Sequence, residues 1–268
     1  METLKDIKGI VFFDVDGTLV DCWKGIEKPT EKTKEAIRRL KENGYLTLIA
    51  TGRPMSFLSD ELKELGVSGY ITSNGTYIEL NNKVILNEEV KQEIVDDIID
   101  FCGKEKIDYI LEGQAYSYIS TKLDDRVGTL VRTFSLPIEK IQDSWEGPIS
   151  VNKLIVIDNG TESFQKICEK YKDDFIFMQH PGKNSYDMYR KGYTKAYGIE
   201  ALLKAIDIPK EKTYAFGDGE NDIEMFELVQ YGIAMGGSHE NLLKQAYKTT
   251  DDVANDGIYN ALVEMKLI

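Results

Sequence analysis

Short apolar runs alternate with segments of helical periodicity along the N-terminal part of the chain. Residues 10–13, 45–50 and 70–72 are short runs rich in β-branched and aromatic residues, which is typical of buried strands. Apolar positions recur at helical spacing within residues 30–44 and again within 54–66, each ending at a glycine, so a helix is expected in both places. This β-α-β-α-β order predicts a parallel sheet with right-handed crossovers.

The strict alternation is lost in the middle of the chain. Residues 76–80 and 83–86 flank Asn81-Asn82 and predict a hairpin, and apolar positions within residues 89–101 predict a helix. More short strands and helices follow, without a regular βα order. We therefore expect a separate α+β unit inserted at residues 82–186.

Alternation resumes after this insertion. Strands are expected at residues 186–189, 213–216 and 231–235, and helices follow each of them in the pattern. The expected fold class is therefore α/β, with a doubly wound parallel sheet formed by residues 1–81 and 187–268.

Composition narrows the classes of function. The 268 residues include 33 Lys and Arg against 46 Asp and Glu, a net charge of −13, which disfavours binding to nucleic acid or an anionic membrane surface. No apolar run is long enough to span a bilayer, and no signal peptide is visible at the start. The three cysteines are widely spaced and form no CxxC pair, so we expect a reduced, cytoplasmic protein. Its oligomeric state is left open by the sequence.

Polar residues cluster at four expected strand ends or helix starts. The clusters are Asp14 with Asp16, then Thr51, then Lys195, and finally Asp218 with Asn221 and Asp222. Each cluster alone has an ordinary explanation, such as a polar turn, a helix cap or a solvated lysine. The pair Asp14/Asp16 by itself fits either a metal site or an acid/base pair.

Taken together, the four clusters fit phosphate chemistry. Several hard oxygen ligands suit Mg²⁺, which keeps water and substrate oxygens in its shell. A lysine and a threonine hydroxyl suit a bound phosphate, and a carboxylate at a strand end can attack phosphorus and form an acyl phosphate. Phosphoryl transfer depends mainly on positioning and on neutralising charge. The sequence therefore predicts a small phosphorylated metabolite as the partner.

The four clusters also resemble a known set of motifs. In order, they are Asp14-Val-Asp16-Gly17-Thr18, Leu48-Ile49-Ala50-Thr51-Gly52-Arg53, Lys191-Gly192-Tyr193-Thr194-Lys195 and Gly217-Asp218-Gly219-Glu220-Asn221-Asp222. This ordered set resembles the haloacid dehalogenase (HAD) superfamily, and the DxDGTL form resembles its phosphatase branch. The insertion after the third strand, with Ser73-Asn74-Gly75, resembles the Cof-type subfamily with a C2-type α/β cap. By this resemblance, residues 1–81 and 187–268 form a Rossmann-like hydrolase core and 82–186 the cap domain.

The resemblance implies a role for each motif residue. Asp14 would be the nucleophile and a Mg²⁺ ligand. Asp16 would act as general acid and base and offer its main-chain carbonyl to the metal. Asp218 would be the third protein ligand, and Asp222 would support the metal shell. The phosphate would be held by Thr51, Gly52, Lys195 and Asn221, with Asn74 and Arg190 as candidate substrate contacts.

The expected function is a Mg²⁺-dependent phosphatase that hydrolyses a small soluble phosphomonoester, a sugar phosphate or a phosphorylated cofactor, through an aspartyl phosphate. A phosphomutase is the alternative within the same chemistry. A phospho-accepting signalling module shares the strand-end aspartates and the lysine, and a catalytically quiet metabolite-binding protein is a further alternative. The presence of both Asp14 and Asp16 favours the enzyme over these last two.

Overall fold

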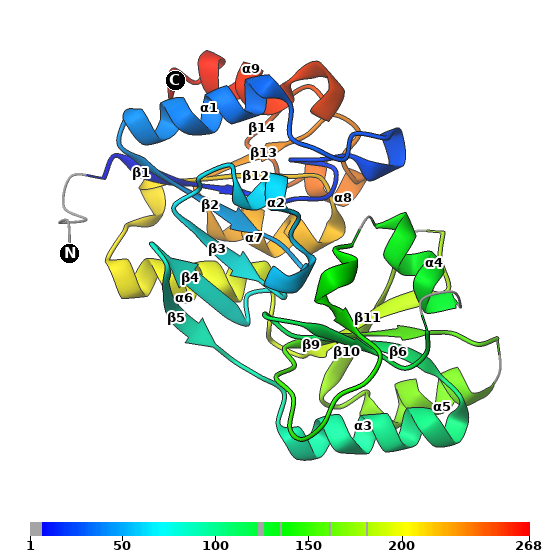
Figure 1. The fold of residues 1–268 in the computed structure, drawn as a ribbon. Helices are drawn as coiled ribbons and strands as arrows, with labels where there is room; N and C mark the ends of the chain where they lie inside the picture. The colour runs from blue at the N-terminus through cyan, green and yellow to red at the C-terminus, as the bar shows by residue number, and fades with distance from the viewer. Residues whose placement is uncertain (1–6, 123–125, 135, 161, 181) are drawn as a thin grey trace. The chain divides into compact units, whose positions relative to one another are not determined.

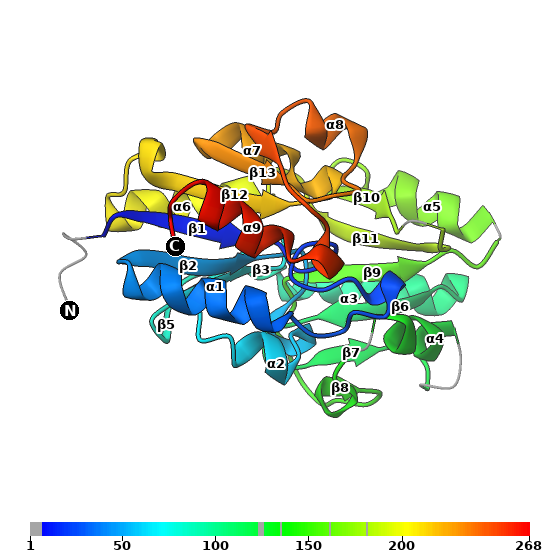
Figure 2. The same cartoon turned by 90° about the horizontal axis from the view of Figure 1, so that it is seen from above.

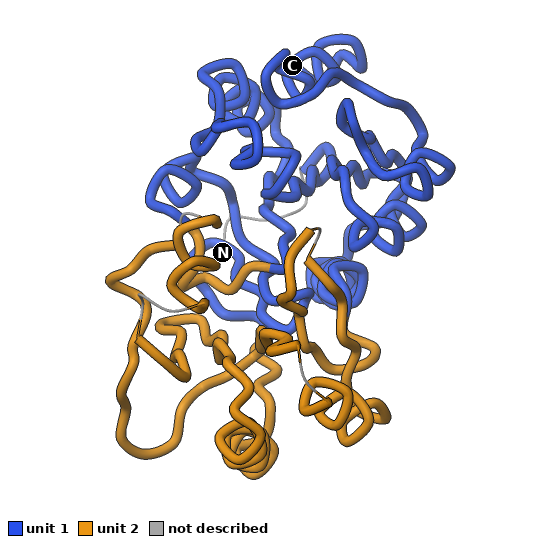
Figure 3. The backbone as a smooth tube through the Cα atoms, turned by 90° about the vertical axis from the view of Figure 1, so that its right-hand side faces the viewer, with its two compact units in different colours: residues 1–52, 59–86, 194–268 blue, residues 53–58, 87–193 orange. Residues whose placement is uncertain are grey.

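The computed structural model describes residues 7–122, 126–134, 136–160, 162–180 and 182–268. The chain divides into two compact units, one of residues 1–52, 59–86 and 194–268 and the other of residues 53–58 and 87–193 (Figure 3). The second unit thus starts and ends slightly later than the expected insertion and also takes up a short segment from the first half of the chain. The functional core at residues 1–81 and 187–268 and the cap at 82–186 remain predictions.

The first unit contains an eight-stranded sheet in the order β14-β13-β12-β1-β2-β3-β4-β5 (Figure 1). Its strands are β1 (Gly9–Phe13), β2 (Tyr45–Ala50), β3 (Gly69–Thr72), β4 (Tyr77–Leu80), β5 (Lys83–Asn87), β12 (Thr213–Gly217), β13 (Tyr231–Ala234) and β14 (Lys248–Thr249). From β14 to β3 all neighbours are parallel, whereas β4 runs antiparallel to β3. All five residues of β1 are buried, as expected for a central parallel strand that is covered on both faces.

Helices cover both faces of this sheet, which makes it doubly wound as predicted (Figures 1 and 2). They are α1 (Glu31–Glu42), α2 (Asp60–Lys63), α6 (Lys195–Ile206), α7 (Ile223–Leu228), α8 (Glu240–Leu243) and α9 (Gly257–Glu264), with 3-10 turns at Cys22–Lys24, Lys210–Lys212, Glu220–Asp222 and Val253–Asn255. Apolar residues of α6, α7 and α8 form one core cluster with Phe12 and Leu48, while α1 packs against α9 and β2. None of the helices in the described part of the chain has the length and hydropathy that a membrane span requires.

The helix expected at residues 54–66 is not formed as one element. A 3-10 turn at Met55–Phe57 is followed by Leu58 in extended conformation and then by the short helix α2. The buried side chain of Phe57 belongs to a hydrophobic cluster with Ile110 and Val127 of the second unit. The helical spacing of the apolar residues therefore gave a wrong prediction, because Phe57 packs in a core of the second unit.

The second unit contains a six-stranded sheet in the order β10-β11-β9-β6-β7-β8. Its strands are β6 (Asp108–Glu112), β7 (Ser117–Ile119), β8 (Ile141–Gln142), β9 (Lys153–Ile157), β10 (Phe175–Gln179) and β11 (Ser185–Arg190), and its helices are α3 (Gln92–Glu105), α4 (Arg126–Thr133) and α5 (Glu162–Tyr171), with a 3-10 turn at Ile138–Lys140. All pairs except β7 with β8 are antiparallel. The strand expected at 186–189 was assigned to the returning core, but it pairs with β9 and β10 in this sheet.

The two faces of the smaller sheet carry different cores. One cluster contains Leu111, Leu154 and Met188 with residues of α3 and α5, and the other contains Ile110 and Ile155 with residues of α4. The alternation of these residues along the strands assigns them to opposite faces. An inserted α+β unit was expected here, and the observed mixture of antiparallel strands and helices agrees with it.

Candidate active site

Three of the predicted clusters lie at the carboxyl ends of adjacent parallel strands. Asp14 follows β1, Thr51 follows β2 and Asp218 follows β12, and β1 pairs with both of the other strands. The backbone N–H of Asp14 still donates to Phe216 O (3.0 Å), so β1 and β12 stay paired up to the first aspartate. Ligands bind outside the carboxyl ends of the strands in open parallel sheets, and these residues occupy that position.

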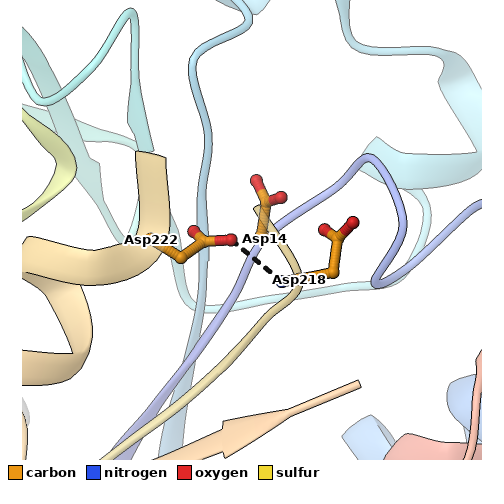
Figure 4. A group of neighbouring side chains, drawn as sticks. All are labelled: Asp14, Asp218 and Asp222. Carbon is orange, nitrogen blue, oxygen red and sulfur yellow. Dashed lines mark hydrogen bonds between the residues drawn. The ribbon is translucent and has the colours of Figure 1, made fainter. Parts of the chain in front are cut away.

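Asp14, Asp218 and Asp222 form a compact acidic group. One carboxylate oxygen from each lies within 4.8 Å of the others. Figure 4 shows the carboxylates of Asp14 and Asp218 pointing to the same side, while Asp222 turns toward the backbone of Asp218. Asp14 is only 4% exposed and Asp222 is fully buried. Such a group is unfavourable unless cations or donors offset its charge.

Lys195 is the cation that enters this group. It is the first residue of α6, and Thr194 caps the helix by accepting a hydrogen bond from Tyr197 N. The Lys195 ammonium is 1% exposed and donates to Asp14 Oδ1 (2.6 Å) and to Asp222 Oδ1 (2.7 Å). Burial alone would lower the pKa of Lys195, but the charges of the two aspartates outweigh it and raise the pKa above its usual range.

Both carboxylate oxygens of Asp222 accept hydrogen bonds from other residues of the chain. Oδ1 accepts from Lys195, and Oδ2 accepts from the backbone N–H groups of Asp218 and Gly219 at 3.0 Å each. A Cβ at Gly217 would lie 2.6 Å from the Asp222 carboxylate carbon, so only glycine fits there. Asp222 thereby fixes both the lysine and the loop that carries Asp218.

The three carboxyl groups outnumber the single ammonium of Lys195. Burial raises the pKa of Asp14 well above its usual range, although Lys195 partly lowers it. Burial also raises the pKa of Asp218 to about 7, and the nearby Asp222 adds to this effect. Three carboxylates with one ammonium fit a divalent cation, and oxygen ligands alone suit Mg²⁺. The residues present therefore fit the expected metal.

Asp16 is placed differently from the other aspartates. Its side chain is exposed and it is not a member of the compact acidic group. The backbone turns sharply directly after Asp16, where Gly17 has a φ of +76°. A Cβ on Gly17 would overlap the Asp218 carboxylate. The turn thus brings the chain backbone against Asp218 while Asp16 faces solvent.

The predicted phosphate-binding residues also converge. Thr51 is buried, and its carbonyl accepts a hydrogen bond from Asn74 N (3.3 Å). A Cβ on Gly52 would lie 3.0 Å from Asn74 Oδ1 and 4.0 Å from Asn221 Nδ2. The loops that follow β2, β3 and β12 therefore meet at Gly52, which has no side chain to fill the space.

Sequence reasoning missed one close approach in this region. Ser73 and Asn74 have left-handed backbone (φ of 51° and 54°), and Gly75 follows. A Cβ on Gly75 would overlap Thr194 O and lie 2.7 Å from Gly198 N. The turn after β3 thus packs directly on the helix start that carries Lys195. Two sequence features indicate this close approach, namely the turn Ser73-Asn74-Gly75 and Gly198 in the interior of α6.

Arg190, a predicted substrate contact, lies at the end of β11 in the second unit. It donates a hydrogen bond to Glu88 O (2.6 Å), and its guanidinium carbon lies 4.1 Å from the ring centroid of Tyr193. These contacts join Glu88, near the start of the stretch 87–193, to Arg190 and Tyr193 at its end.

Comparison with known proteins identifies the family. The model of the haloacid dehalogenase-like hydrolases matches residues 11–262. The chain belongs to the haloacid dehalogenase-like hydrolase family. The resemblance proposed from the four motifs is therefore confirmed, and so is the fold class of a Rossmann-like core with an inserted cap.

Individual members of the family are similar over most of their length. The Bacillus subtilis (strain 168) protein named "Putative phosphatase YkrA" is 28% identical over 97% of this chain and 98% of its own. The Escherichia coli (strain K12) protein named 5-amino-6-(5-phospho-D-ribitylamino)uracil phosphatase YbjI is 24% identical over 84% of each chain. The solved structure of BT4131, described as a HAD subclass IIB sugar phosphatase, is 26% identical over 97% of this chain and 100% of its own, with a TM-score of 0.79.

Proposed function

We propose that this HAD-family hydrolase is a Mg²⁺-dependent phosphatase that acts on a small phosphomonoester through an aspartyl phosphate on Asp14. The observation that carries the proposal is the buried group in which Lys195 bridges Asp14 and Asp222 beside Asp218. BT4131 is described as a sugar phosphatase, and YbjI is named as a phosphatase of 5-amino-6-(5-phospho-D-ribitylamino)uracil. We therefore propose sugar phosphates or a phosphorylated cofactor as the substrate class.

In this mechanism Lys195 orients the nucleophile. Its ammonium binds Asp14 Oδ1, so we assign the attack on phosphorus to Oδ2. Attack forms the bond between Asp14 and phosphorus and breaks the bond between phosphorus and the alcohol oxygen of the substrate. Lys195, Thr51, Gly52 and Asn221 would bind the transferred phosphoryl group, because a cation and hydrogen-bond donors offset its charge.

Asp16 would handle the protons. As a carboxylic acid it gives its proton to the departing alcohol oxygen, and as a carboxylate it then takes a proton from the water that attacks the aspartyl phosphate. Its side chain is exposed, so it can exchange protons with water. The second attack releases inorganic phosphate and restores Asp14.

The metal would be held by Asp14, by the main-chain carbonyl of Asp16 and by Asp218, with Asp222 fixing the loop of Asp218. When bound, Mg²⁺ would neutralise charge on the phosphoryl oxygens. The chain itself supplies the nucleophile, the proton donor and the lysine.

Removal of the metal tests this assignment. We expect EDTA to lower phosphate release from an aryl phosphate by at least about 10³-fold, because the charge on the phosphoryl oxygens would then lack its metal cation. Excess Mg²⁺ should restore the full rate. Activity that is unchanged in EDTA would contradict the metal-dependent mechanism.

The substrate class is tested by a phosphate-release screen over sugar phosphates, nucleotides and phosphorylated cofactors. We expect sugar or polyol phosphates to have the highest kcat/KM. Return of the phosphoryl group to a sugar, without free phosphate, would instead identify a phosphomutase.

The turn at Gly17 gives a sharper test of the geometry. Gly17→Ala forces a Cβ into the Asp218 carboxylate, so we expect phosphate release to fall about 100-fold from misplacement of Asp218. Gly25→Ala is the matched control, since Gly25 has a similar φ of +72° with nothing within 4 Å of the added Cβ. Gly25→Ala should lose about 1 kcal/mol of unfolding free energy from backbone strain, and Gly17→Ala should lose more because of the overlap with Asp218. Equal activity of the two variants would contradict the placement of Asp218 in the site.

A further inference from the structure

The chain crosses between the two units at four points. It leaves the first unit after Gly52 and returns at Ser59, leaves again after Leu86, and returns at Thr194 (Figure 3). The first crossing directly follows Thr51 and Gly52, and the last is followed at once by Lys195. Three of the residues proposed to bind phosphate thus adjoin a crossing point.

The segment Arg53–Leu58 is firmly bound within the second unit. Ser56 is 1% exposed, and its hydroxyl donates to Gly113 O (2.7 Å) and lies 2.9 Å from Ser117 Oγ. Phe57 is part of a hydrophobic cluster of the same unit. The backbone N–H of Met55 donates to Gln114 Oε1 (3.0 Å). This segment is therefore held to the β6–β7 hairpin by both packing and hydrogen bonds.

The hydrogen bonds continue from Gln114 to the second crossing. Gln114 Nε2 donates to Asn152 Oδ1 (2.9 Å). Asn152 is 1% exposed, and its Nδ2 donates to Asn87 Oδ1 (2.9 Å) and to Glu88 O (3.4 Å). Asn87 and Glu88 are the first residues of the second unit after Leu86.

The same chain of hydrogen bonds reaches the last crossing. Arg190 donates to Glu88 O (2.6 Å), and the Tyr193 hydroxyl donates to Glu88 Oε2 (3.2 Å). Tyr193 is the last residue of the second unit before Thr194. Side-chain hydrogen bonds therefore connect the crossing segments to one another. This network consists of Gln114, Asn152, Asn87, Glu88, Arg190 and Tyr193.

We propose that Gln114 and Asn152 are positioning residues for the phosphate-binding backbone at Thr51–Gly52, acting through Met55. The inference rests on the proposed function. Gln114 and Asn152 together link Met55 to Asn87 and Glu88. They favour one arrangement of these segments, because leaving the donor or acceptor of the buried Asn152 side chain unpaired is costly. The network thus couples the crossing segments to the loop that receives the phosphoryl group.

The test compares Gln114→Leu with Gln92→Leu. Gln92 is the matched control, because it also bridges a backbone N–H (Ile149 N, 3.2 Å) and a side chain (Asp96 Oδ1, 2.8 Å) in the second unit, away from residues 53–58. We expect Gln114→Leu to lower kcat for an aryl phosphate about tenfold with KM changed less than about twofold. Gln92→Leu should keep the wild-type kcat. Asn152→Leu should lower kcat like Gln114→Leu, and the double variant should lose no more than either alone.

Hydrogen exchange gives a readout that does not depend on turnover. The Thr51 amide donates to Ile71 O (2.9 Å) within the first unit, and neither substitution removes a partner of this bond. We expect its exchange to become faster in Gln114→Leu and to stay unchanged in Gln92→Leu. Wild-type kcat in Gln114→Leu, or faster exchange at Met55 without any change at Thr51, would overturn the positioning role. Absence of phosphate release by the wild type would instead overturn the proposed function, and the exchange at Thr51 would still decide the positioning role.

Discussion

We expect Asp14→Asn to lower phosphate release by at least about 10³-fold, because the amide cannot attack phosphorus and form the acyl phosphate. Asparagine keeps the size of the side chain and an acceptor for Lys195, which binds Asp14 Oδ1 at 2.6 Å. The substitution also removes one charge from a group of three carboxylates that has a single ammonium. The variant should therefore fold at least as stably as the wild type.

The measurement is single-turnover and steady-state release of inorganic phosphate, with urea unfolding as the check on the fold. Asp60→Asn is the control, since this exposed aspartate begins the short helix α2 outside the acidic group. An Asp14→Asn variant that retains wild-type turnover would exclude the aspartyl phosphate.

The second large effect concerns stability of the second unit. We expect Lys153→Met to lower the free energy of unfolding by about 3–5 kcal/mol, because it leaves buried carboxylates without their cation. The Lys153 ammonium is almost fully buried and lies 2.8 Å from Asp187 Oδ1 and 3.2 Å from Glu112 Oε2. Burial lowers the pKa of Lys153, but these two carboxylates outweigh it and raise the pKa. Urea unfolding followed by the fluorescence of Trp145, which packs in this unit, measures the loss.

Glu112→Gln is the control for this variant, and it has its own pH dependence. Burial raises the pKa of Glu112 from 4.5 to about 7, although Lys153 partly lowers it. A raised pKa of the folded state means that the contribution of Glu112 to stability is complete below pH 4.5 and is lost as the pH rises through 7. Glu112→Gln should therefore match the wild type near pH 4 and become the more stable of the two by pH 8. A loss of stability at pH 8 as large as that of Lys153→Met would contradict the assigned charges.

Local patterns were enough to predict most of the larger sheet. The strand at residues 45–50 and the start of α1 after Thr30 agree with the sequence analysis, because Thr30 accepts a hydrogen bond from Thr33 N and the apolar face of α1 is buried. The meeting of Asp14 and Asp218 was also predictable, since both follow parallel strands. The roles assigned to these residues stay predictions.

The features of the fold that the sequence did not predict depend on long-range packing. The spacing of Phe57, Leu58 and Leu62 is helical, but Phe57 packs in a core separate from the one beneath the first sheet. The strand Ser185–Arg190 has no local feature that assigns it to one sheet rather than the other, and only its partners β9 and β10 decide this. The convergence of Gly75 and Gly198 likewise depends on the path of the whole chain.

The strand order of the larger sheet has a consequence for the timing of folding during synthesis. The central strand β1 is made first, yet one of its two neighbours is β12, with Ile10 beside Thr213. Pairing across so long a loop is slow, and the edge of β1 that faces β12 stays unpaired until the ribosome has synthesised β12. Residues 87–193 emerge in between as nearly all of the second unit. A nascent chain therefore has most of its second unit available for folding before Asp14 and Asp218 can meet, so we expect metal binding to begin only after β12 has emerged.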